Sequence, residues 1–338
     1  VQIINGMNNS DHSTRTVLLS KKVPGLMVVS RGSQSNLDVL SANISTGHAQ
    51  VKAFNLMNRT NTYNYETAGL RLAWGVRNEI GIAEHPTTGG IWGVENSADQ
   101  ITRDGVDVST NNPGEELNYF GYLNGTNYPE QGQFFGYPWC LTAWNTTELP
   151  QSSNLSVGSP FAFDGAGDLN GQNRTDTFCA GTVAPRLTFQ AHMAPLDIKF
   201  NNSAAQAWVT FHGSWDRQVP VGYKLSVVQF SSSGQPTAAS TSTTAATDII
   251  SNMDNSACPN NCFRPVGLAF DSRGRIFMSS DASGEIYLIT RTTANPVTSS
   301  SSSAPSSTSS TSSTAAAAGG KATGSFTAAA LAVLAWLA

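Results

Sequence analysis

Two groups of polar residues stand where expected strands meet loops. They are Arg77 and Asn78, before the strand expected at 80–83, and Asn96, Ser97 and Asp99, after the strand expected at 91–94. A guanidinium beside a carboxamide suits an anionic or carbonyl-bearing ligand, because both groups donate hydrogen bonds. The oxygen atoms of the second group suit a hard cation such as calcium, since no His or Cys lies among them. The alternative is a salt-bridged arginine beside a polar turn, and this stretch alone leaves both interpretations open.

Further residues that could do chemistry occur at other expected strand-to-loop junctions. They are Asp11, His12, the segment 31–33, His192, the segment 212–217 and Arg264. A closed propeller brings such junctions to one end of its axis, so we expect these residues to surround a common site. Taken singly, each also has an ordinary interpretation as a hydrogen-bonded loop histidine or a surface arginine.

The elements that must position these residues are strands. A strand–turn–strand pattern recurs with turn centres at 25, 89, 203 and 274, while amphipathic helices are almost absent from the 338 residues. The pattern predicts an all-β fold, a β-propeller, in which the long interval from 89 to 203 holds an insertion or an extra unit. A β-sandwich is the structural alternative.

The composition excludes some partners and indicates a compartment. Charged residues make up 12%, the net charge is −4 and no basic run occurs, which argues against a nucleic-acid or anionic-membrane surface. Secretion is expected because eight Asn-X-Ser/Thr sites occur, at Asn8, Asn43, Asn58, Asn124, Asn145, Asn154, Asn173 and Asn201. We therefore expect a glycoprotein that is exported from the cell.

Four cysteines suit disulfides in a secreted chain. Cys258 and Cys262 are expected to close a small loop, which leaves Cys140 to pair with Cys179. A metal site at Cys258 and Cys262 is the competing interpretation, although no further His or Cys stands nearby to complete it.

The two ends of the chain differ from its body. The sequence starts at Val1 without an initiator methionine or signal peptide, so we expect an upstream part to be absent. Residues 293–318 form a Ser/Thr-rich segment that is typical of an O-glycosylated stalk. Residues 319–338 combine small residues, a short polar spacer and an apolar end, which predicts a GPI-attachment signal. The expected location is therefore the extracellular cell surface, with membrane contact only through the GPI lipid.

An ordered set of motifs resembles one enzyme family. The motifs are Asp11–Thr16, Gly75–Asn78, Glu116–Asn118, Ala194–Leu196, Phe211–Trp215 and Arg264–Ala269. In this order they are similar to those of the soluble quinoprotein glucose/sorbosone dehydrogenases, and most similar to fungal pyranose dehydrogenases that depend on pyrroloquinoline quinone (PQQ). The resemblance covers about residues 5–292 and implies a six-bladed propeller over 1–292 that binds PQQ and calcium. About five blades would be represented here, with the family's first blade absent.

The resemblance also implies a role for each matching residue. His12 would be the general base, Asp11 would contact the sugar, and Arg77 and Asn78 would face the reactive quinone carbonyl. His192, Arg217 and Arg264 match positions that line the cofactor. Asn96 and Ser97 match positions whose main-chain oxygens bind calcium, and Asp99 would be a nearby carboxylate. The sequence differs from bacterial members by an insertion between Asp99 and Glu115.

The function that the resemblance implies is oxidation of a pyranose sugar at its anomeric carbon. Hydride would pass to the quinone, and electrons would then pass to an external cytochrome or quinone, since the chain has no haem motif. No Rossmann glycine fingerprint favours NAD or FAD. The alternatives are a calcium-dependent propeller hydrolase of the lactonase or esterase type and a non-catalytic cell-surface propeller that binds carbohydrate.

Overall fold

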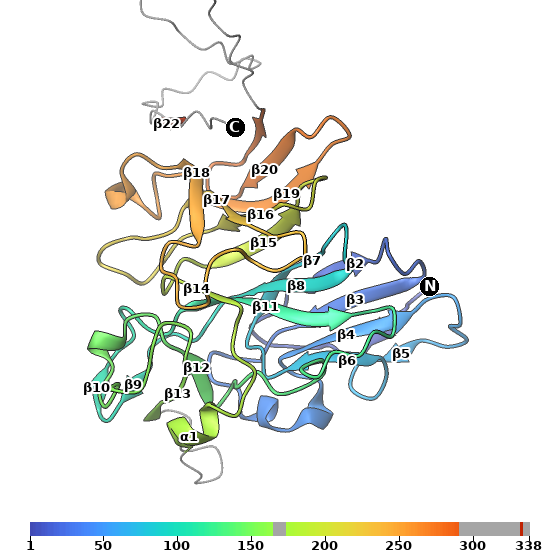
Figure 1. Ribbon diagram of the computed structural model, residues 1–338, viewed down its shortest axis with the longest axis horizontal. Helices are drawn as coiled ribbons and strands as arrows, with labels where there is room; N and C mark the ends of the chain where they lie inside the picture. Colours follow the sequence, from blue (N-terminus) through green and yellow to red (C-terminus); the bar gives the residue numbers. More distant parts are fainter. Residues whose placement is uncertain (165–173, 291–331, 334–338) are drawn as a thin grey trace, which may run out of the picture.

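The computed structural model describes residues 1–164, 174–290 and 332–333, and nearly all of its regular structure is β-strand. Four sheets of three to five strands follow one another along the chain (Figure 1). The first two contain β2 (Val17–Leu19), β3 (Leu26–Arg31), β4 (Gln50–Asn55) and β6 (Leu70–Trp74), then β7 (Glu79–Glu84), β8 (Gly90–Glu95), β11 (Glu115–Tyr122) and β14 (Leu187–Phe189). The third contains β15 (Pro195–Phe200), β16 (Gln206–Phe211), β17 (Lys224–Gln229), β18 (Ala246–Ser251) and β22 (Ala332–Val333), and the fourth contains β19 (Pro265–Phe270), β20 (Ile276–Ser280) and β21 (Glu285–Ile289).

The remaining elements are short and lie in the connections. They are the pairs β1 (Ile4–Asn5) with β5 (Tyr63–Asn64), β9 (Thr102–Arg103) with β10 (Val106–Asp107) and β12 (Cys140–Thr142) with β13 (Pro160–Ala162), the helix α1 (Asp176–Cys179), and 3₁₀ turns at Val39–Ala42, Ile44–Thr46, Thr146–Glu148 and Asn255–Ala257. Because β12, β13 and α1 lie between β11 and β14 of one sheet, the long interval in the repeat is an insertion. The described strands form four blade sheets, where about five were expected.

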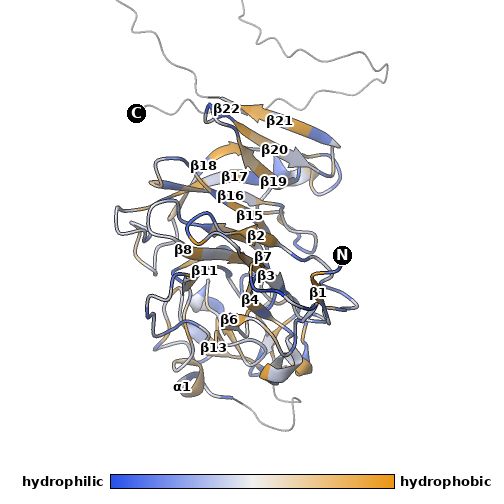
Figure 2. Ribbon diagram, turned by 90° about the vertical axis from the view of Figure 1, so that its right-hand side faces the viewer, coloured by the Kyte–Doolittle hydropathy of each residue, from blue (hydrophilic) through white to orange (hydrophobic). Residues whose placement is uncertain are grey.

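The arrangement of the sheets is that of a β-propeller, which confirms the predicted fold. Neighbouring strands in the four sheets are antiparallel, and each sheet begins with a hairpin at one of the four predicted turn centres. The first strands of successive sheets are in contact, β2 with β7, β7 with β15 and β15 with β19. In the side view of Figure 2 the sheets follow one another from β6 to β21, and hydrophobic residues are concentrated in their strands.

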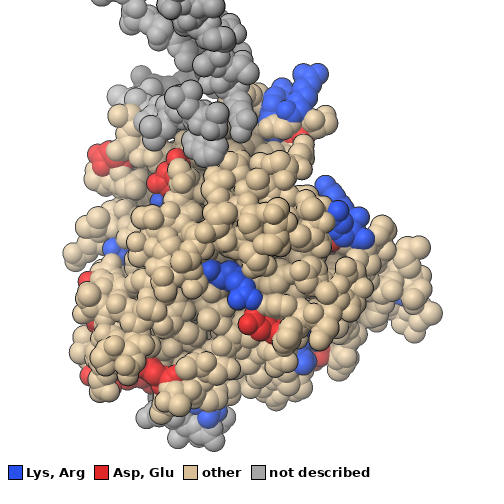
Figure 3. Space-filling model, in the orientation of Figure 1, with Lys and Arg blue, Asp and Glu red and all other residues tan. Residues whose placement is uncertain are grey.

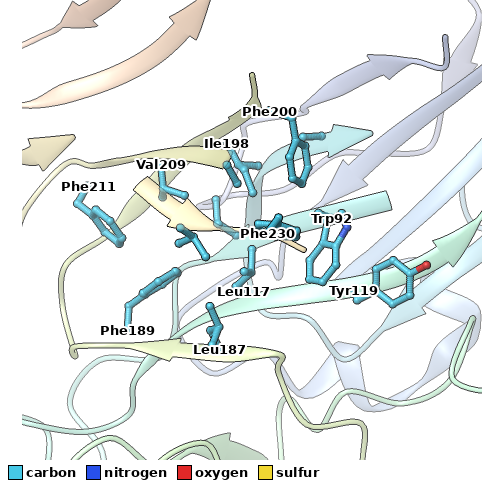
Figure 4. Packing of buried hydrophobic residues seen from close by; sticks show 14 of the residues in the cluster. Trp92, Leu117, Tyr119, Leu187, Phe189, Ile198, Phe200, Val209, Phe211 and Phe230 are labelled. Atoms are coloured by element: carbon cyan, nitrogen blue, oxygen red, sulfur yellow. The ribbon is translucent and has the colours of Figure 1, made fainter. Parts of the chain in front are cut away.

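The largest hydrophobic cluster holds the second sheet against the third. Trp92 of the second sheet packs on Phe230, with the two rings edge to face at 5.0 Å between centroids, and Tyr119 lies on the other side of Trp92 (Figure 4). Trp92 is fully buried. Burying a large apolar side chain contributes about 1.5–3 kcal/mol, so this contact fixes the two sheets that supply most of the site.

Both predicted disulfides are present, Cys140–Cys179 between β12 and α1, and Cys258–Cys262 across a short loop before β19. Charged side chains are few and scattered on the face seen in Figure 3. No described helix has the length and apolar character needed to cross a bilayer. The predicted stalk and GPI signal lie outside the described residues apart from Ala332–Val333, so the lipid anchor and the cell-surface location stay predictions.

Candidate functional site

A polar pocket of about 490 Å³ lies where the ends of strands from all four sheets meet. All but one of the residues predicted for the site line it. These are Asp11, His12, Arg77, Asn78, Asn96, Ser97, Asp99, His192 and Arg264. They come from segments that precede β2, β7, β15 and β19 or follow β8, so the expected convergence of strand-to-loop junctions is observed.

His12 is oriented by the segment that follows β3. Its Nδ1 lies 3.1 Å from the carbonyl oxygen and 2.9 Å from Oγ of Ser33. Because a carbonyl oxygen only accepts, Nδ1 carries the hydrogen and Nε2 keeps its lone pair. Burial, with a further contribution from Arg77, lowers the pKa of His12 to about 4, so the ring is neutral at pH 7. His12 therefore offers the pocket a neutral proton acceptor.

The main chain that carries His12 is fixed by Asn9. The Asn9 amide nitrogen donates to the carbonyl oxygens of His12, Gly32 and Ser33 at 3.0, 2.9 and 3.0 Å. Gly32 also leaves room for two pocket residues, because a Cβ there would lie 2.5 Å from Oδ1 of Asn78 and 2.9 Å from Cβ of His12. The positions of His12 and Asn78 thus depend on a glycine at the end of β3.

We expect the titration of the His12 ring, followed by NMR of the ligand-free protein, to have its midpoint near pH 4. An unfolded chain would titrate near 6.5. Between these values only the unfolded state binds the proton, so this residue makes the protein less stable as pH falls from 6.5 to 4. A measured midpoint near 6.5 would show that the ring is not held in the buried environment described above.

Arg77 is a buried cation whose side chain is held on several sides. Its Nε donates to the carbonyl oxygen of Asn36 at 3.1 Å, and Nη2 donates to Oδ1 of the same residue at 2.8 Å. Nη1 donates to the carbonyl oxygen of Asn96 at 3.1 Å, and Nη2 lies 3.4 Å from Oδ2 of Asp99. These contacts fix the guanidinium at the pocket wall before any ligand binds.

A buried carboxylate cluster lies behind Arg77. Glu95 accepts a hydrogen bond from the main-chain nitrogen of Arg77 at 2.6 Å. The carboxylates of Glu79, Glu95 and Glu116 all lie within 3.1–3.3 Å of the side-chain nitrogen of Asn118. Burial raises the pKa of each of these three carboxyl groups. Protonated members can then share hydrogen bonds, which keeps the end of the second sheet intact beneath the pocket.

His192 supplies a second fixed cation. Its Nε2 donates to the carbonyl oxygen of Ser109, while Nδ1 lies 3.4 Å from Oδ1 of Asp99 and 3.3 Å from Oδ2 of Asp216. Burial alone would lower the pKa of His192, but the bond with Asp99 and the other neighbours raise it to about 9. The backbone at His192 and at Ala194 is left-handed, with φ of 65° and 52°, an uncommon conformation that turns the imidazole towards the carboxylates.

Several groups in the pocket could ligate a cation. Asp99 and Asp216 each place a carboxylate oxygen within 4.8 Å of the other, beside the imidazole of His192, which as a cation has no lone pair to offer a metal. The carbonyl oxygen of Asn96 accepts a bond from Arg77 and keeps a second lone pair. Ser97 is fixed beside it, because its main-chain nitrogen donates to Glu115 at 2.8 Å. Carboxylate and carbonyl oxygens suit calcium, so the predicted ligands Asn96, Ser97 and Asp99 lie together but their role stays a prediction.

Glu115 joins the two loops of this region. Its carboxylate accepts from the main-chain nitrogens of Ser97 and Ala194, at 2.8 and 3.0 Å. Burial raises the pKa of Glu115 to about 7. Both oxygens already accept hydrogen bonds, so Glu115 shapes the pocket by connecting the segments after β8 and before β15.

The two remaining predicted arginines differ in position. Arg264 lines the pocket and donates to the carbonyl oxygens of His212 and Gly213 at 3.1 and 2.9 Å. Arg217, predicted to line the cofactor, is not among the pocket residues. Its guanidinium instead contacts the carbonyl oxygen of Thr110 and Oδ1 of Asn111. Both partners belong to the insertion between Asp99 and Glu115, and the role of Arg217 along the cofactor stays a prediction.

Several pocket residues had no role assigned to them from the sequence. They are Asn36, Gln100, Glu115, His212, Trp215 and Asp216. Residues 212–216 lie in a segment that was already expected at the site, and Glu115 directly precedes the motif Glu116–Asn118, so their position beside predicted site residues was the available signal. Asn36 lies in a Ser/Asn-rich loop that carries no pattern, and only the folded structure shows its contact with Arg77.

Comparisons with known proteins match nearly the whole described body of the chain. The model of a family described as TrAA12-like matches residues 1–292. A pyrroloquinoline quinone-dependent sugar dehydrogenase of Hypocrea jecorina (strain QM6a) is 45% identical over 294 residues, which cover 86% of this chain and 65% of that relative. The chain thus spans slightly less than two thirds of the length of this relative.

Two solved structures are also similar. The calcium structure of the Trichoderma reesei protein of Carbohydrate-Active Enzymes Family AA12 matches with a TM-score of 0.80 and 47% identity, over 85% of this chain and 70% of that chain. The holo form of the pyranose dehydrogenase PQQ domain from Coprinopsis cinerea matches with a TM-score of 0.77 and 37% identity, over 86% and 72%. With its fold, pocket and sequence all in agreement, the chain belongs to the TrAA12-like family.

Proposed function

We propose that this chain is the cofactor-binding part of a PQQ- and calcium-dependent sugar dehydrogenase. One observation carries the proposal: a neutral histidine with a free Nε2 faces the same pocket as three fixed cations, Arg77, His192 and Arg264. Two of the proteins named above support it: the Hypocrea jecorina relative is described as dependent on pyrroloquinoline quinone, and the Coprinopsis cinerea structure is the holo form of a PQQ domain.

The chemistry of the pocket fits these two groups. PQQ is a planar quinone that carries three carboxylates, and cations at a pocket wall are the partners that such an anion requires. The pocket volume of about 490 Å³ lies within the range that small-ligand sites occupy. Ser97, Asp99 and Asp216 offer the oxygen atoms that calcium prefers, next to the same cations.

The residues of the chain then have defined tasks. His12 accepts the proton of the anomeric hydroxyl at Nε2, while Ser33 holds the ring through Nδ1. Arg77, with Asn78 beside it, places a fixed positive charge where negative charge develops on the acceptor oxygen. When bound, PQQ would supply the hydride acceptor for the anomeric carbon and calcium would supply a Lewis acid beside it. Asp11 stands exposed at the pocket, where its carboxylate can accept hydrogen bonds from sugar hydroxyls.

In the proposed reaction the reduced cofactor passes its electrons to an external acceptor, a cytochrome or a quinone. A hydrolase that acts on lactones or esters would also use a histidine and carboxylates with calcium. It would have no need of three cations around a polyanionic ligand, so the geometry favours the dehydrogenase.

The proposal is tested by adding PQQ and calcium to the ligand-free full-length protein and then adding pyranose sugars. We expect a bound quinone absorbance that bleaches with sugar, and a rise in melting temperature that is larger for both ligands together than for calcium alone. Lactone or ester hydrolysis with calcium alone would favour the hydrolase. Sugar binding without bleaching would favour a non-catalytic carbohydrate-binding propeller.

Gly32→Ala is expected to slow the reaction without unfolding the protein. The added Cβ would clash with Asn78 and His12, and a displacement of reacting groups by about 1 Å can reduce rate by about 10²-fold. Gly267→Ala is the matched control, because a Cβ there meets only Oγ of Ser279, at an ordinary 3.5 Å. Turnover and circular dichroism of both variants are the measurements. Equal turnover in the two variants would show that the close approach at Gly32 does not position the base.

A further inference from the structure

Trp215 is an indole that the fold exposes at the pocket. Its side chain is 64% exposed, yet it lines the pocket together with Asp11 and His12. Among the described residues it belongs to none of the buried hydrophobic clusters or to the partly buried side chains packed on them. A large aromatic residue that the fold does not use for packing is available to contact a ligand.

The chain before Trp215 is firmly held. Ser214 donates its main-chain N–H to the carbonyl oxygen of Val221 at 2.9 Å, and its Oγ accepts from the N–H of Val221 at 3.1 Å. The hydroxyl of the fully buried Tyr223 donates to the carbonyl oxygen of Ser214. The loop that leaves β16 is therefore closed upon itself directly before the tryptophan.

The chain after Trp215 is held as well. Asp216 places its carboxylate 3.3 Å from Nδ1 of His192, and Arg217 reaches Thr110 and Asn111 in the insertion. The residues on both sides of the tryptophan are thus anchored, and the contact of Asp216 with His192 connects the loop to another part of the site. A tryptophan held in this way loses little conformational entropy when a ligand packs on it.

We propose that Trp215 is the stacking surface for the pyranose ring of the substrate, an inference that rests on the proposed function and specifies its sugar subsite. One face of a pyranose presents C–H groups with partial positive charge, and the face of an indole carries the negative part of its quadrupole. Exposed Asp11 accepts hydrogen bonds from the hydroxyls, while Arg77 and His192 lie more deeply buried, where the guanidinium of Arg77 faces the anionic cofactor. The platform therefore selects substrates with an apolar ring face over small open-chain aldehydes.

The test compares Trp215→Ala and Trp215→Phe in the full-length protein loaded with PQQ and calcium. We expect Trp215→Ala to raise the KM for pyranose about 10-fold, because the sugar would lose one aromatic contact that it buries on binding. The change in kcat should be smaller, and the Kd for PQQ should be unchanged. Trp215→Phe should restore part of the loss. Val219→Ala, a change at a 71% exposed apolar residue of the same loop that does not line the pocket, is the matched control.

A second readout does not need the reaction. In the protein without PQQ, pyranose should quench tryptophan fluorescence, and this quenching should be absent from Trp215→Phe. An unchanged KM for pyranose in Trp215→Ala would overturn the inference. A change confined to the KM for a protein electron acceptor would also overturn it, because Trp215 would then belong to a surface that docks this acceptor. Failure of the wild-type quinone to bleach with any sugar would instead overturn the proposed function, and the inference with it.

Discussion

His12→Asn is expected to lower turnover with sugar by about 10²–10⁴-fold while PQQ still binds, since general-base catalysis is lost. The asparagine amide can replace the Nδ1–H that His12 donates to Ser33 but has no counterpart of the basic Nε2. The loss should therefore appear in kcat, with the Kd for PQQ close to that of the wild type. Turnover and a PQQ titration on the same preparation measure both quantities.

Ser33→Ala gives the graded comparison for this experiment. It removes the Oγ contact of 2.9 Å with His12 and the bond from Oγ to the carbonyl oxygen of Ser35, but it leaves the Ser33 carbonyl oxygen that accepts from Nδ1. Its effect on turnover should therefore be much smaller. Wild-type turnover in His12→Asn would place the base elsewhere. His192 is a poor replacement, because its Nε2 donates to Ser109 and its raised pKa keeps the ring protonated at pH 7.

Arg77→Ala is expected to weaken PQQ binding and also to reduce kcat by about 10²–10³-fold. The change removes a buried cation together with the contacts that it makes with Asn36 and Asp99. Arg77→Lys should be intermediate, because an ammonium keeps the charge but cannot reach the two Asn36 oxygens as a planar fork does. PQQ titration and single-turnover bleaching of the bound quinone separate the two effects.

Arg59→Ala makes the same change of net charge at a surface position, where the guanidinium contacts only Asn61 in its own loop. It should leave both quantities unchanged. Wild-type PQQ affinity together with wild-type turnover in Arg77→Ala would remove this residue from the site. Melting temperatures of all three arginine variants distinguish a local effect from loss of the fold.

Much of this site could be predicted from the sequence because its residues lie at the ends of strands whose hairpin turns have a recognisable local sequence. Turns such as Pro86–Gly90 and Asp271–Gly274 mark the first hairpin of a sheet, and polar residues at the other ends of those strands must then lie together. Arg77 and Arg264 were found in this way. The resemblance to a family added roles to residues whose positions the pattern already indicated.

The sequence could not predict contacts between segments that are far apart in the chain when one of them carries no recognisable motif. Asn36 holds Arg77 across 41 positions of chain, and nothing near Asn36 marks it as a site residue. Arg217 illustrates the reverse, since its segment was expected at the site but the insertion between Asp99 and Glu115 provides its partners. The direction of a side chain depends on such long-range contacts. A local sequence pattern therefore predicts which segments of the chain meet more reliably than it predicts which atoms are in contact.

The pocket is built from segments that run from Asp11 to Arg264, one or more from each sheet. No single hairpin contains a usable part of it, because the base, the buried arginine and the last arginine are separated by most of the chain. Such non-local contacts form late in folding, as loop closure must precede them. Affinity for any ligand of this pocket is therefore a probe of folding itself: a chain that has formed all its hairpins but has not yet brought the fourth sheet against the third cannot bind.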